Sequence, residues 1–160
     1  MLKYKNLFQP INLGNQHFRS RIFAAPQDYP GLTPDNLLTK EAVAFYEAKA
    51  MGGFASVCLG DFIVDSVSGH SHPFQLKGDD IRGKVNLTRA ANAIIRNGAV
   101  ASVELNHAGG NAMPMPEGFV YGVMDGVRDD GIAIRAMDEL WIERIIEKYA
   151  KGAALARQCG

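Results

Sequence analysis

Residues 99–110, AVASVELNHAGG, bring a carboxylate, an amide and an imidazole together directly after an apolar run. The apolar run has the length of a buried strand, and its Gly-rich end predicts a turn. Period-two alternation places Glu104 and Asn106 on one face of this strand and the apolar side chains on the other. Because active-site loops follow the carboxyl ends of parallel strands, Glu104, Asn106 and His107 predict one wall of an active site.

The elements around this strand alternate between strands and helices. The patterns first predict a hairpin within residues 7–22 and a strand over 21–25 that Pro26 ends. A helix from Thr33 or Thr39 to Met51 follows, then a strand over 54–59 and a helix over 85–97. After the strand described above come a long loop over 109–136 and a helix from Asp138 onward. Apolar stripes predict the buried faces of the last two helices: Leu87, Ala90, Ala91, Ile94 and Ile95 on one, and Ile142, Ile145, Ile146, Tyr149, Ala153 and Ala154 on the other.

This alternation implies right-handed crossovers and a parallel sheet. We therefore expect an α/β fold in a single domain over residues 1–160, either a small open layer or the N-terminal portion of a (β/α)8 TIM barrel with an N-terminal hairpin and about three βα units. A complete barrel needs roughly 200 residues or more. In the barrel, the apolar stripe of the last helix would pack between the third strand and a fourth that lies beyond Gly160.

Composition narrows the classes of function and partner. The chain has 160 residues, with 17 basic and 17 acidic side chains and a net charge of zero, so its charge favours neither nucleic acid nor an anionic membrane. Apolar runs stay well short of the roughly 18 residues that a membrane helix needs, and the N-terminus lacks the apolar core of a signal peptide. A cytoplasmic protein is the expectation. The two cysteines, Cys58 and Cys159, match no metal motif or redox pair.

Four segments resemble the NADH:flavin oxidoreductase family, the old yellow enzyme group, and are most similar to its 2,4-dienoyl-CoA reductase and enoate reductase-like branch. They are LFQPINLGNQHFRSRIFAAP, YEAKAMGGFASVCLGDFIV, VELNHAGG and MDELWIERIIEKYAKGAALARQCG, in the family's order and spacing. The resemblance covers the whole chain but only the first part of the family's barrel.

The resemblance implies an FMN at the mouth of the barrel. Ala25, Pro26 and Gln27 match positions whose backbone lies against the isoalloxazine ring. Asp28 stands where relatives often have Thr, Ser or Cys, which commonly hydrogen-bond the flavin. A carboxylate there would disfavour added electron density on the ring.

Three further positions follow from the resemblance. Gly60 matches a small residue where the ring approaches the second strand. Glu104 stands where the family has a glutamine that pairs with the flavin's pyrimidine edge, and a carboxylate can only accept there unless it is protonated. His107 matches a family histidine that organises the loop, and Gly110 replaces the family's arginine.

The implied activity is ene reduction, with hydride passing from reduced FMN to an activated alkene and NAD(P)H as the reductant. The expected substrate is a small enone or enoate. The catalytic His/His or His/Asn pair and a proton-donating tyrosine are expected beyond Gly160. An iron–sulfur cluster is expected only in a longer relative, and we expect no metal here.

Two alternatives remain open. One is a non-catalytic half-barrel that needs a partner chain or a homo-oligomer to fold, since the third strand's edge and the last helix would favour association. The other is a metal-dependent barrel hydrolase built on His107 with His70 and His72, although no acidic ligand motif accompanies them.

Overall fold

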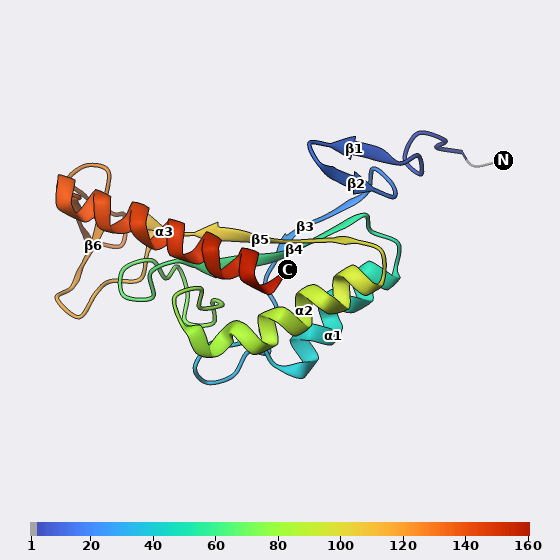
Figure 1. Ribbon diagram of the computed structural model, residues 1–160. Coiled ribbons are helices and arrows are strands. Elements are labelled where there is room, and N and C mark those ends of the chain that lie inside the picture. The colour runs from blue at the N-terminus through green and yellow to red at the C-terminus, as the bar shows by residue number, and fades with distance from the viewer. Residues whose placement is uncertain (1–2) are drawn as a thin grey trace.

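A three-stranded parallel sheet forms the centre of the molecule. Its strands are β3 (Phe23–Gln27), β4 (Ser56–Ile63) and β5 (Val100–Asn106), in the order β3-β4-β5. The computed structural model describes residues 3–160, so Met1 and Leu2 of the expected domain lie outside the described residues. A separate hairpin of β1 (Ile11–Leu13) and β2 (Gln16–Phe18) projects from one end of the sheet (Figure 1). The predicted hairpin and parallel βα units are therefore confirmed.

The helices begin at the side-chain caps that the sequence offers. Helix α1 (Lys40–Met51) starts at Thr39, whose hydroxyl accepts from the Ala42 N–H, and α3 (Glu139–Cys159) starts at Asp138, whose carboxylate accepts from the Trp141 N–H. Helix α2 (Lys84–Arg96) lies between them in the chain. The alternative start of α1 at Thr33 is wrong, because Thr33 closes a turn with Leu37 instead of capping a helix.

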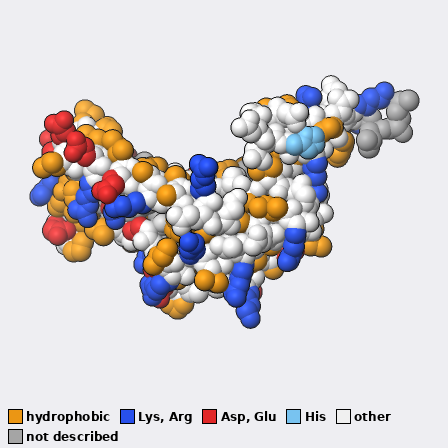
Figure 2. All heavy atoms as spheres, in the orientation of Figure 1, with side chains coloured by type: hydrophobic (Ala, Val, Ile, Leu, Met, Phe, Trp, Pro, Cys, Tyr) orange, Lys and Arg blue, Asp and Glu red, His pale blue; other side chains and the backbone are white. Residues whose placement is uncertain are grey.

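The hydrophobic core lies between the sheet and the helices α1 and α2. Helix α2 buries most of its predicted stripe, although Ile95 is exposed and Ala93 is buried in its place. Of α3, only Gly152 and Cys159 are buried, and its predicted stripe is largely uncovered. Figure 2 shows apolar side chains gathered at the end of the molecule where α3 begins. Within residues 3–160, no helix combines the length and the apolar character that crossing a membrane requires.

The predicted long loop over 109–136 is wrong in its interior. A second sheet forms there from β6 (Phe119–Gly122), β7 (Gly126–Val127) and β8 (Ala133–Ala136), in the order β6-β8-β7. Strand β6 pairs with β8 in parallel, and β7 pairs with β8 antiparallel. The Gly and Pro content of this segment reflects tight turns between short strands rather than an unstructured connection.

Two bulges shape the carboxyl end of the main sheet. The β3–β4 register shifts between Ala24 and Gln27, and the β4–β5 register shifts between Leu59 and Phe62. Pro26 therefore does not end its strand as predicted, since it falls inside the first bulge, where its missing N–H breaks no ladder hydrogen bond. The second bulge contains Asp61 in the left-handed region, at φ 54°, and β4 continues past the predicted end at Leu59.

Candidate functional site

The two bulges face each other. Gly60 in β4 lies against the backbone of β3, and a Cβ at this position would stand 2.5 Å from the Gln27 nitrogen. Real side chains do not reach this separation, so the close approach of the strands requires glycine. The bulges next to this contact turn Asp28 and Asp61 toward the mouth of the sheet, where an active site is expected.

A shallow hollow opens at this end of the sheet. It is lined by Pro26, Gln27, Asp28, Gly60, Asp61, Glu104 and Asn106, and it measures about 270 Å³. The structure thus brings together five of the six residues expected to contact a cofactor, and Ala25 does not line the hollow. The volume is below the roughly 300–1,000 Å³ of enclosed ligand pockets, so the hollow is one wall of a larger site.

Three carboxylates dominate the hollow, and we call Asp28, Asp61 and Glu104 the acidic wall. Asp61 is held by two side-chain amides, because Gln75 and Asn106 each donate to one of its oxygens. Its backbone N–H points to the Glu104 carboxylate, at 3.4 Å. These contacts hold the Asp61 side chain in place as a hydrogen-bond acceptor.

Asp28 has a different partner. The His72 Nε2 lies 3.2 Å from an Asp28 carboxylate oxygen and 3.6 Å from an Asp61 oxygen. The Phe74 N–H donates to the other ring nitrogen of His72. This assigns the ring proton of neutral His72 to Nε2, so His72 presents a proton to the two carboxylates, whereas a metal ligand would present a lone pair.

Burial and neighbouring charge act together on Asp28. Burial raises the pKa of the Asp28 carboxyl above its usual value, and the nearby Asp61 carboxylate raises it further. The hydrogen bond from His72 opposes both effects without cancelling them. Asp28 is therefore the carboxyl whose environment favours its neutral form.

His107 lies outside the hollow and belongs to a buried hydrogen-bond chain. Its Nδ1 accepts from the Gly109 N–H, and its Nε2 lies 3.0 Å from the Ser68 hydroxyl. Ser68 in turn donates to the buried Asp65, at 2.6 Å. Because the hydroxyl proton is directed at Asp65 and the ring proton at Ser68, this chain holds loops together and contains no activated nucleophile.

This arrangement separates the histidines that a metal-dependent hydrolase would need. His107 contacts Ser68, whereas His72 contacts Asp28 and Asp61. Sequence patterns missed Asp61, which lines the hollow, and His72, which contacts two of its carboxylates. Asp61 carried a weak signal, since this polar residue stands two positions after the apolar run that ends at Leu59. His72 carried none, because its contact with Asp28 spans 44 positions of the chain.

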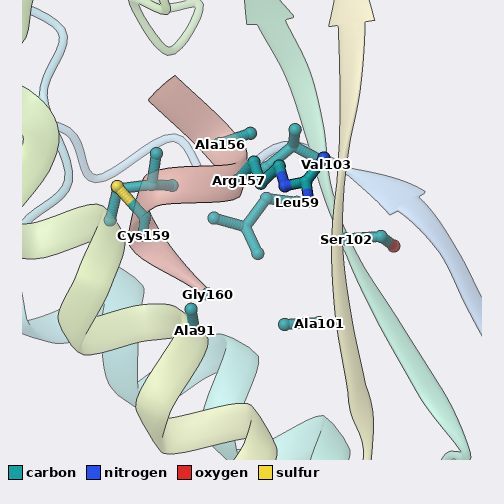
Figure 3. Close-up of a pocket in the computed structure, with 10 residues that line it drawn as sticks. Leu59, Ala91, Ala101, Ser102, Val103, Ala156, Arg157, Cys159 and Gly160 are labelled. Carbon is teal, nitrogen blue, oxygen red and sulfur yellow. The ribbon is translucent and has the colours of Figure 1, made fainter. Parts of the chain in front are cut away.

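A second cavity lies on the helix side of the sheet (Figure 3). It measures about 190 Å³, and its lining is mostly apolar, including Leu59, Ala91, Val103 and Cys159. Figure 3 shows the Ser102 side chain directed to the opposite side of its strand, the side that alternation shares with Glu104. The predicted division of this strand into a polar and an apolar face is confirmed, and the cavity is separate from the hollow.

Comparisons with known proteins agree with this architecture. A sequence model of the NADH:flavin oxidoreductase / NADH oxidase family matches residues 6–160. An NADH oxidase from Thermoanaerobacter brockii is 26% identical and is aligned over 98% of this chain and 25% of its own length. A metal reductase from Desulforamulus reducens is 32% identical over 64% of this chain and 15% of its own length.

Solved structures share the fold at lower identity. A 2-naphthoyl-CoA reductase in complex with 2-naphthoyl-CoA superposes with a TM-score of 0.89 at 19% identity, over 98% of this chain and 26% of that chain. An Old Yellow Enzyme from Pichia sp. AKU4542 superposes with a TM-score of 0.84 at 18% identity, over 96% of this chain and 43% of that one. The expectation of a partial TIM barrel is confirmed. Since the family model matches nearly the whole chain, this chain belongs to the NADH:flavin oxidoreductase / NADH oxidase family, and it spans about a quarter or less of the length of those two curated relatives.

Proposed function

We propose that this chain supplies the flavin-facing wall of an FMN-dependent oxidoreductase that uses NAD(P)H to reduce the double bond of an enone or enoate. The observation that carries the proposal is the convergence of Gln27, Gly60 and Glu104 on one hollow at the carboxyl ends of three parallel strands. Membership of the family supports FMN as the cofactor, and the NADH oxidase among the relatives supports a nicotinamide reductant.

The residues of the hollow fit a flavin through hydrogen bonding and shape. When bound, FMN supplies hydride transfer from NAD(P)H to the β-carbon of the alkene. With a flavin bound, Glu104 would accept from the N–H at the edge of the ring, and the NH2 group of Gln27, whose amide oxygen accepts from Lys49, would donate to a ring carbonyl. Gln75 and Asn106 hold Asp61 in place, so the shape of the wall is set before the flavin arrives.

Titration of FMN into the full chain tests the proposal, with quenching of flavin fluorescence as the measurement. We expect saturable binding at one site. Glu104→Gln restores an amide that both donates and accepts, so it should bind FMN more tightly than Glu104→Ala by about tenfold, equivalent to one hydrogen bond. Failure of the wild-type chain and of both variants to bind FMN would overturn the proposal.

A second candidate is a non-catalytic half-barrel that associates with another chain. The exposed apolar side chains on the first turns of α3 favour it, since Leu140, Ile142 and Ile146 are 77%, 46% and 63% exposed. Sedimentation velocity distinguishes the two candidates. A dimer that forms without flavin, from a chain that does not bind added FMN, supports the associating half-barrel. A monomer that binds FMN excludes the associating half-barrel.

A further inference from the structure

Carboxylates outnumber amides in the lining of the hollow. The pyrimidine edge of the flavin ring presents two carbonyl acceptors on either side of one N–H donor. The acidic wall offers three carboxylates, which only accept when they are ionised. The two amides that line the hollow are partly engaged, because Asn106 uses one amide hydrogen for Asp61 and the Gln27 amide oxygen accepts from the Lys49 ammonium, at 2.8 Å. An ionised carboxylate that faces a flavin carbonyl repels it, whereas the same group in its acid form donates a hydrogen bond to it.

The titratable groups around Asp28 come from four elements. Asp61 lies on β4, Glu104 on β5, His72 on the loop after β4, and Tyr46 on α1. The Tyr46 hydroxyl donates to the backbone oxygen of Gln27, at 2.9 Å, and so keeps its proton engaged there. Among the described residues, no lysine or arginine forms an ion pair with the acidic wall. The His72 imidazole thus lies beside two of the three carboxylates, and the nearest lysine contact with the lining is that of Lys49 with the Gln27 amide oxygen, at 2.8 Å.

The hydrogen bonds single out which carboxyl takes the proton. Asp61 already accepts from Gln75 and Asn106, and protonation would break one of these contacts. Glu104 accepts from the Asp61 N–H and has its second oxygen for the flavin N–H. Asp28, by contrast, accepts within the described chain from His72, at 3.2 Å, which leaves its other oxygen able to carry a proton.

We propose that Asp28 takes up one proton from solvent when the flavin binds and donates a hydrogen bond from its carboxylic acid to a flavin carbonyl oxygen. His72 keeps its Nε2 proton and continues to donate to the other oxygen of Asp28. This inference rests on the proposed flavin site and adds that binding is linked to a proton. The raised pKa of Asp28 agrees with it, since the same burial and Asp61 charge disfavour the ionised form.

Riboflavin is the probe that isolates this effect, because the FMN phosphate itself titrates with a pKa of about 6. Calorimetric titrations of the full chain at pH 6.5, in two buffers of different ionisation enthalpy, count the protons taken up with riboflavin. When the titrations are repeated at higher pH, we expect the uptake to approach one proton per riboflavin bound. The dissociation constant should rise with pH, by up to about tenfold per pH unit above the pKa of Asp28.

Asp28→Asn tests the assignment. Its amide donates at every pH, so we expect binding with no proton uptake and a dissociation constant that does not change with pH. Asp35→Asn is the matched control, because Asp35 is an exposed carboxylate paired with Arg82 away from the hollow. It should behave as the wild type. The two-buffer measurement on the wild-type chain stands by itself if Asp28→Asn fails to fold.

The outcomes separate this inference from the flavin site itself. Riboflavin that binds without proton uptake and with constant affinity overturns the inference and leaves the flavin site standing. Uptake that persists in Asp28→Asn but disappears in Glu104→Gln places the proton on Glu104 and also overturns it. No binding of riboflavin or FMN at any pH, by the wild type or by Asp28→Asn, overturns both.

Discussion

Gly60 and Gln27 touch through their backbones, and a Cβ on Gly60 would stand 2.5 Å from the Gln27 nitrogen and 2.6 Å from its carbonyl carbon. This contact joins the bulge of β4 to the bulge of β3. Both bulges turn acidic side chains into the same hollow, so the contact sets the geometry of the candidate site.

Gly60→Ala should therefore destabilise the chain. The added methyl group meets backbone atoms that have no side-chain freedom to move aside, and we expect a loss of about 2 kcal/mol in the free energy of unfolding. Urea denaturation followed by circular dichroism measures it. Gly126→Ala is the control, because nothing lies within 4 Å of the Cβ built there. Equal effects of the two substitutions would contradict the steric account.

Arg19 links the hairpin to the C-terminal ends of α1 and α2. Its guanidinium donates to the backbone oxygens of Asn97 and Phe54, at 2.7 and 2.8 Å, and also to that of Ala50. Arg19→Ala leaves these carbonyls without their charged donor, and we expect a loss of about 3 kcal/mol, measured by urea denaturation. Arg21→Ala, an exposed neighbour, should leave the denaturation midpoint unchanged. A similar loss of stability in both variants would assign the effect to the positive charge of this segment and not to the hydrogen bonds of Arg19.

The buried Asp65 should make stability depend on pH. Burial alone would raise its pKa, but the hydrogen bond from Ser68 and the ammonium of Lys148, at 3.0 Å, outweigh burial and hold the pKa below its usual value. A carboxyl with a lowered folded-state pKa stabilises the fold above its unfolded pKa of about 3.9, and this contribution disappears as pH falls through the folded-state pKa.

Lys148→Ala removes the partner of Asp65 and should cost about 3 kcal/mol at pH 7, because a buried carboxylate is left without its cation. The loss should shrink as pH is lowered and Asp65 is protonated in the variant. Denaturation midpoints between pH 3 and 7 measure both effects. Lys151→Ala, which breaks an exposed pair with Glu147, serves as the control and should follow the wild-type curve. A pH-independent loss in Lys148→Ala would contradict the pairing.

His107 should affect stability but not flavin binding. Burial lowers the pKa of His107, so the unfolded chain binds a proton more readily and this group destabilises the fold as pH falls below about 6.5. His107→Gln should cost about 1–2 kcal/mol at pH 7 through its lost contacts with Ser68 and Gly109, and should remove this acid sensitivity. The affinity for FMN should stay the same. A fall in affinity without a fall in stability would place His107 in the binding site.

Periodicity and capping residues predicted the elements that local interactions determine. Thr39 and Asp138 cap their helices where expected, and Glu104 lies on the predicted face of its strand. The bulges were not predictable, because the register shift at Asp61 depends on how β4 pairs with both neighbours. Likewise, the pairing of β6 with β8 joins segments with no shared pattern.

The candidate site likewise contains residues that single segments predict and contacts between distant segments that they do not. Gln27, Gly60 and Glu104 were expected because single segments resemble the family, whereas the contact of His72 with Asp28 forms only when the loop after β4 folds back over the end of β3. No local pattern encodes such a contact, so the sequence named the carboxyls Asp28 and Glu104 but not Asp61 or the imidazole of His72 beside them.

The most direct test of the flavin site is a heteronuclear NMR titration of the full chain with riboflavin, which reports which backbone amides change their surroundings. We predict saturable shift changes that centre on Gln27, Asp28, Gly60, Asp61 and Glu104. Shift changes centred instead on the apolar cavity, at Ala91 and Ala101, or spectra that do not change at saturating riboflavin, would contradict the account.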